Sequence, residues 1–85
     1  MANYRVQIKK SAAKELEALP TIDRQRIVER IRSLSTNPRP MGSEKLTGEE
    51  RYRIRQGDYR ILYEIHDRKI FVVVIKIGNR RNVYR

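Results

Sequence analysis

The chain has 85 residues, of which 39% are hydrophobic, and its 20 Lys/Arg against 10 Asp/Glu give a net charge of +10 at pH 7. This length predicts one small domain spanning residues 1–85. The absence of cysteine excludes a disulfide framework and a thiolate metal site. No apolar run reaches membrane-spanning length and no signal-peptide region follows Met1, so we expect a soluble, cytoplasmic protein without a membrane partner.

The positive charge is concentrated in the second half of the chain. Residues 1–50 hold ten basic and seven acidic side chains, whereas residues 51–85 hold ten basic and three acidic ones. Nucleic acid is the commonest partner of such a surface, and an acidic protein is the next. A solvated basic surface with no specific ligand is the remaining interpretation.

The first elements are a strand and a short helix. Residues 4–9 alternate apolar and polar side chains, which predicts an amphipathic strand. Ser11 has the chemistry of a helix N-cap. The apolar residues that follow have helical spacing, and Pro20 ends the helix. They are Ala12, Leu16 and Leu19.

A second helix follows at once. Thr21 can cap it, and Asp23 in its first turn suits the positive end of the helix dipole. Its apolar stripe is formed by Ile27, Ile31 and Leu34, with Val28 beside them. The residue before a proline avoids the helical conformation, so Asn37-Pro38 should end this helix. The two helices form a helical hairpin whose apolar side needs a partner.

Residues 37–50 are predicted to be irregular, because prolines and glycines interrupt every pattern there. Lys45 lies in this segment. It could make an additional phosphate contact, or it could be an ordinary solvated loop lysine.

The next segment has the clearest strand pattern in the chain. Arg51, Arg53 and Arg55 alternate with Tyr52 and Ile54, which predicts one buried face and one face lined by guanidinium groups. The residues Gln56-Gly57-Asp58 are typical of a tight turn. A second strand then carries Arg60 on the face opposite its apolar side chains. Such a hairpin presents several arginines together, which suits phosphate.

After a turn at residues 66–69, the β-branched run of residues 70–77 predicts a central strand buried on both faces. The expected order is β-α-α-β-β-β, an α+β domain. In it the helical hairpin packs on one face of a small, mostly antiparallel sheet, and the other face carries the arginines.

The sequence offers little conventional catalytic chemistry. It has one histidine, His66, beside a turn, and no paired acids at metal-binding spacing, so we expect neither a metal nor a cofactor. It also has no nucleophile elbow, P-loop or dinucleotide fingerprint.

Arginine and tyrosine remain. Arg53, Arg55 and Arg60 come from the hairpin, and a second basic group comes from the tail. That group is Arg80, Arg81, Tyr84 and Arg85. If the tail runs beside the hairpin, the cluster could bind RNA, orient a phosphate and stabilise a charged transition state.

RNA carries its own nucleophile, the 2′-hydroxyl, so such a site needs alignment, charge stabilisation and proton transfer. Arginine does not deprotonate at ordinary pH. Tyr84 can act as the base if surrounding positive charge lowers its pKa, or it can stack on a nucleobase. A terminal aromatic packed on the sheet is the structural alternative.

Residues 52–64 resemble the core of the RelE/ParE superfamily of bacterial toxins. The tail, Gly78-Asn79-Arg80-Arg81 with Val83-Tyr84, resembles the RelE branch. The resemblance implies the toxin of a type II toxin–antitoxin system, an endoribonuclease that cleaves mRNA in the ribosomal A site through the 2′-hydroxyl and without metal.

The resemblance also implies roles for individual residues. The catalytic positions would be Arg53, Arg55, Arg60, Arg80 and Tyr84. Further RNA contacts would come from Lys45, Arg51, Arg81 and Arg85. Arginine at positions 53 and 55, where the best-known member has lysine, keeps the charge but makes proton transfer there harder.

The implied partners are the ribosome with its mRNA and an acidic antitoxin, and the pair would bind operator DNA only through the antitoxin. A flexible acidic chain can neutralise several arginines at once. One alternative is a ParE-like, non-enzymatic inhibitor of DNA gyrase. Another is a basic domain that only binds nucleic acid, with a steep salt dependence.

Overall fold

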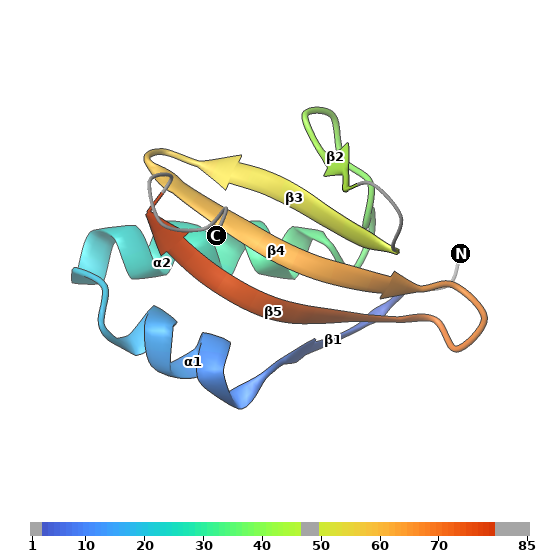
Figure 1. Cartoon of the computed structure of the whole chain (residues 1–85), viewed down its shortest axis with the longest axis horizontal. Coiled ribbons are helices and arrows are strands. Elements are labelled where there is room, and N and C mark those ends of the chain that lie inside the picture. The colour runs from blue at the N-terminus through green and yellow to red at the C-terminus, as the bar shows by residue number, and fades with distance from the viewer. Residues whose placement is uncertain (1–2, 47–49, 80–85) are drawn as a thin grey trace.

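The computed structural model describes residues 3–46 and 50–79. The elements in these ranges are β1 (Arg5–Ile8), α1 (Lys10–Glu17), α2 (Thr21–Ser33), β2 (Glu44–Lys45), β3 (Arg51–Gln56), β4 (Tyr59–His66) and β5 (Phe71–Asn79). The strands form one sheet in the order β1-β5-β4-β3-β2, with α2 passing behind it in Figure 1. Among these described strands, only β1 and β5 pair in parallel. The predicted α+β architecture, with two helices on a mostly antiparallel sheet, is confirmed.

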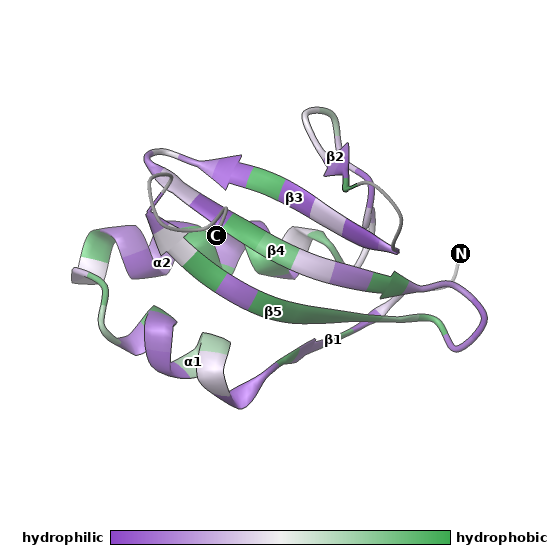
Figure 2. Cartoon of the chain, in the orientation of Figure 1, coloured by the Kyte–Doolittle hydropathy of each residue, from purple (hydrophilic) through white to green (hydrophobic). Residues whose placement is uncertain are grey.

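The core lies between the helices and one face of the sheet. Its helical residues are Ala12, Leu16, Ile27, Ile31 and Leu34. Its sheet residues are Tyr52, Ile54, Ile61, Tyr63, Ile65, Val72, Val74 and Ile77. Strand β3 alternates between strongly hydrophilic residues and residues that are pale or green, whereas β5 is hydrophobic over most of its length (Figure 2). Period-2 alternation therefore directs the arginines of β3 to the face that the helices leave open.

The two turns that join the last strands differ in their chemistry. Gly57, between β3 and β4, has a φ of +60°, which glycine adopts without steric cost, as the sequence predicted. The β4–β5 turn places Ile70 at a φ of +55°. A β-branched residue is strained in this left-handed region, and the sequence pattern gave no sign of it.

Several predicted details of the elements are wrong. Neither Ser11 nor Thr21 is an N-cap: the N-caps are Lys9 and Pro20, and no side chain caps either helix. Helix α2 ends at Ser33, before Asn37-Pro38. The segment at 37–50, predicted to be irregular, contains β2, a strand too short to show a period.

Strand β5 lies between β1 and β4, as predicted for the β-branched run, but it continues to Asn79. Its burial alternates: Val72 and Val74 are buried under the helices, whereas Phe71 and Val73 are only partly covered. The prediction of burial on both faces therefore holds for one face only.

A network of polar side chains centred on Arg39 fixes the segment before β2. Arg39 donates hydrogen bonds to both carboxylate oxygens of Asp67, at 3.3 and 2.8 Å, and to the Tyr52 hydroxyl at 3.1 Å. The Tyr4 hydroxyl donates to the same carboxylate at 2.7 Å. These hydrogen bonds lower the pKa of Asp67, and the bond from Arg39 has the largest effect. The network ties the approach to β2 to the N-terminal strand and the β4–β5 turn.

Within the described residues, no helix is both long enough and apolar enough to cross a membrane.

Candidate functional site

The register of β3 and β4 brings three of the predicted catalytic arginines together. Arg55 lies directly opposite Arg60, and Arg53 lies opposite Leu62 on the same face. Arg53 and Arg60 are only 9% and 7% exposed, whereas Arg55 is exposed. Arginine is rarely buried in proteins. Two of the three guanidinium groups are thus held against the sheet, and the third extends into solvent beside them. We call these three residues the arginine cluster.

Like charges directly opposite each other destabilise a sheet, and a carboxylate offsets part of this cost. Glu44 of β2 pairs in register with Arg53, whose Nη2 donates to Glu44 Oε1 at 2.8 Å. This hydrogen bond, together with the charges of Arg53, Arg55 and Arg60, holds the pKa of Glu44 below its usual value. The sequence does not predict this role for Glu44, because nothing in a two-residue strand signals its partner.

Two predicted RNA-binding residues lie near the cluster but have acidic neighbours. Arg51, on the same face of β3, donates from Nε to Glu64 Oε2 at 3.2 Å. His66 contacts the other oxygen of Glu64 at 3.1 Å. Lys45, on β2, is exposed, and its Nζ lies 3.9 Å from Glu50 Oε1. Both are surface cations within reach of a long polyanion, and they are less sharply positioned than the cluster.

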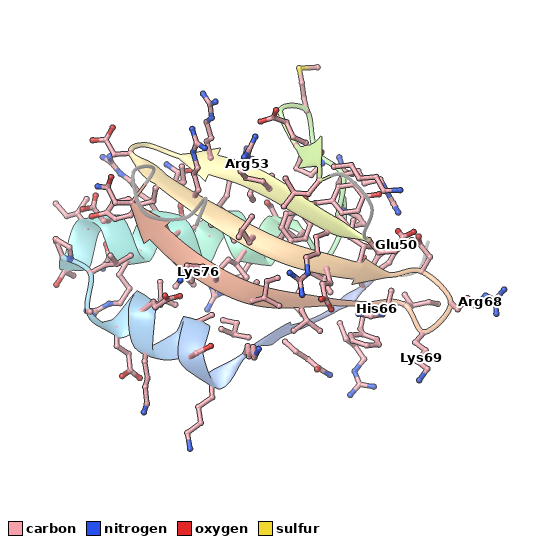
Figure 3. The ribbon with its side chains drawn as sticks, viewed as in Figure 1. Glu50, Arg53, His66, Arg68, Lys69 and Lys76 are labelled. Atoms are coloured by element: carbon pink, nitrogen blue, oxygen red, sulfur yellow. The ribbon has the colours of Figure 1, made fainter. Side chains whose placement is uncertain are left out.

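The open face is hollowed between Arg51 of β3 and Lys9, which follows the edge strand β1. A shallow depression of about 550 Å³ is lined there by three apolar side chains, three cations and the carboxylate of Glu64. Its lining residues are Lys9, Arg51, Leu62, Glu64, Val73, Ile75 and Lys76. Figure 3 shows Arg53 and Lys76 over the sheet, and Arg68 and Lys69 projecting from the β4–β5 turn. Basic groups therefore lie at several points between the arginine cluster and the β4–β5 turn.

The predicted residues Arg80, Arg81, Tyr84 and Arg85 lie outside the described residues. Strand β5 brings the chain beside the cluster before that point, since Gly78 pairs with Arg60 and Asn79 with Tyr59. No group of three or more His, Cys, Asp or Glu able to hold a metal ion occurs in residues 3–46 and 50–79.

The chain is similar in sequence to known proteins. Residues 6–84 match the family described as the ParE toxin of the type II toxin–antitoxin system, parDE. The chain is 31% identical over 86 residues to the toxin RelG of Mycobacterium tuberculosis, and the match covers 96% of this chain and 97% of that protein.

Solved structures of RelE proteins have the same fold as this chain. A chain in the crystal structure of the archaeal RelE–RelB complex from Pyrococcus horikoshii superposes with a TM-score of 0.84 at 32% identity, covering 95% of this chain and 99% of that one. A chain of the intact Escherichia coli RelBE toxin–antitoxin complex gives 0.78 at 28% identity, covering 89% and 95%. The chain therefore belongs to the ParE toxin family of type II toxin–antitoxin systems, within the RelE/ParE superfamily, and has the RelE fold.

Proposed function

We propose that this protein is a ribosome-dependent endoribonuclease, the toxin that stops translation by cutting mRNA in the ribosomal A site. The observation that carries the proposal is the arginine cluster: Arg53, Arg55 and Arg60 on one face of two paired strands. Guanidinium groups match the geometry of phosphate oxygens, and two of these three are already held in place. Because folding already orders these two side chains, binding a phosphate costs less side-chain entropy.

The cleavage step in this proposal needs no metal. The 2′-oxygen attacks the adjacent phosphorus and the 5′-oxygen leaves, which produces a 2′,3′-cyclic phosphate. The arginine cluster, joined by Arg80, stabilises the additional negative charge on the phosphoryl oxygens. Tyr84 takes part in proton transfer, and Lys45, Arg51, Arg81 and Arg85 hold the flanking phosphates.

An acidic antitoxin is the proposed protein partner. The Pyrococcus horikoshii and Escherichia coli structures are complexes of RelE with RelB. The basic open face of this chain is suited to an acidic, flexible segment, which would cover the cluster and block access of RNA. The pair would bind operator DNA through the antitoxin, and the toxin would act in the cytoplasm.

A second candidate is ParE-like binding to DNA gyrase without catalysis. The matching family description names ParE and favours it, although the relatives and structures above carry RelE names. In a gyrase supercoiling assay this alternative predicts inhibition that survives loss of the arginine cluster, whereas the endonuclease proposal predicts no inhibition.

The experiment that tests the proposal uses an mRNA with a single 2′-deoxynucleotide at the cut position, programmed into a translating ribosome. We expect the all-ribose mRNA to be cut at that codon only when the ribosome is present, and the 2′-deoxy mRNA to remain intact there. Cutting of the 2′-deoxy mRNA at the same bond would rule out attack by the 2′-oxygen.

A further inference from the structure

Glu44 occupies an unexpected place for an acid. It lies on β2, directly opposite Arg53 of β3, and its Oε1 accepts a hydrogen bond from Arg53. Its side chain is nevertheless 54% exposed. Oε2 has no hydrogen-bond partner among the described residues. One carboxylate oxygen is therefore fixed against the arginine cluster, and the other is available to a ligand.

A carboxylate is costly in a site for phosphate, because it repels the ligand that the arginines attract. Neutralisation of the opposed Arg55 and Arg60 accounts for part of its presence. It does not account for the exposed oxygen beside the place where a phosphodiester would lie. A group that accepts a proton is also what the cluster lacks, because arginine stays protonated.

We propose that Glu44 is the general base of the cleavage reaction, an inference that rests on the proposed endonuclease function. Glu44 Oε2 removes the proton from the 2′-hydroxyl while the 2′-oxygen forms its bond to phosphorus. The bond from phosphorus to the 5′-oxygen breaks, and Tyr84 supplies the proton that this oxygen takes up. Each of the two proton transfers then has its own group.

The surroundings of Glu44 suit this role. The charged groups that face it are Arg53 and Arg55 of β3 and Arg60 of β4. Because they lower the pKa of this carboxyl, it is ionised throughout the neutral range, which is the form that a general base requires. In this proposal the same arginines contact the phosphate, so they both stabilise the negative charge on its oxygens and position the carboxylate that accepts the proton.

The test compares Glu44→Gln with wild type and with Glu29→Gln, which makes the same charge change on an exposed residue of α2. Glutamine keeps an oxygen that can accept the Arg53 hydrogen bond but cannot take a proton. Single-turnover cleavage on the ribosome and ribosome affinity are both measured, with thermal melting to verify folding. We expect cleavage by Glu44→Gln to slow roughly 100-fold or more, with affinity unchanged or higher. Glu29→Gln should behave as wild type.

The pH dependence provides a second measurement. A carboxylate base gives a wild-type rate that does not rise between pH 6 and 8, whereas a tyrosine base of ordinary pKa gives a rate that rises about tenfold per pH unit. Unchanged or faster cleavage by Glu44→Gln, while wild type cuts, would overturn this inference alone. A rate that rises tenfold per unit would also overturn it. Intact mRNA with folded wild-type protein would overturn the proposed function and this inference together.

Discussion

For Arg53 and Arg60, the sequence pattern predicts the correct face of the sheet but not how deeply the side chains are buried. Alternation along β3 and β4 correctly predicted that both lie on the face away from the helices. It could not predict that both would be almost fully buried, because burial here depends on pairing between distant parts of the chain. The same limit hid Glu44, whose partner Arg53 is specified by strand register and not by spacing.

Tyr84 can be tested by removing only its hydroxyl. We expect Tyr84→Phe to bind the ribosome with nearly wild-type affinity and to cleave mRNA roughly 100-fold more slowly, because a positioned proton-transfer group typically contributes that much. The measurement is single-turnover cleavage at saturating ribosome. An unchanged rate would reassign Tyr84 to stacking or packing.

At the scale of elements, the hairpin of β3 and β4 could be predicted almost completely, from the alternation at 51–56 to the turn at Gly57. Both helices could be predicted from their apolar stripes, although their capping residues could not. What could not be predicted depends on long-range contacts. The parallel pairing of β1 with β5 and the Arg39–Asp67 pair join residues far apart in the chain, and no local period encodes them.

The β4–β5 turn should become more stable when its backbone strain is removed. A non-glycine residue in the left-handed region costs about 1–2 kcal/mol, and glycine gives up part of that gain through the entropy of the unfolded chain. We expect Ile70→Gly to raise the free energy of unfolding by up to about 1 kcal/mol, measured by urea denaturation.

Lys69→Gly is the matched control in the same turn. Lys69 is not among the described residues with positive φ, so glycine there should destabilise the fold. Equal destabilisation by both substitutions would show that Ile70 is not strained.

The Asp67 network should make stability depend on acid pH. The pKa of Asp67 is lowered below its ordinary 3.8 by hydrogen bonds from Arg39 and Tyr4. A lowered pKa gives stabilisation that is present above the unfolded-state value and lost as the pH falls through the folded-state value. Asp67→Asn should therefore melt below wild type at pH 7, and the difference should shrink as the pH falls below about 4.

Asp58→Asn, the same change in the β3–β4 turn, is the control. It should melt close to wild type at pH 7, because this carboxylate has no hydrogen-bond partner in the described part of the chain. If Asp67→Asn and wild type differ equally at all pH values, the ionised carboxylate does not stabilise this network.

At the scale of the whole molecule, the two faces of the sheet differ in the kind of side chain that they carry. The helical face buries the apolar side chains that stabilise the fold, and the open face carries the arginine cluster and the surrounding cations. A net charge of +10 on so small a protein favours attraction to a polyanion over long distances. Sequence composition alone indicates this attraction, and the geometry of the open face supports the proposed cleavage at a phosphodiester.

The most direct test of this account is primer extension on mRNA in a reconstituted translating ribosome. Wild type is compared with Arg60→Ala, which removes a buried member of the cluster, and with Arg26→Ala, which removes an exposed arginine of α2. We predict codon-positioned cuts by wild type and Arg26→Ala, and cutting slower by roughly 100-fold or more in Arg60→Ala. Equal cutting by folded Arg60→Ala and wild type would contradict the assignment of catalysis to the arginine face of the sheet.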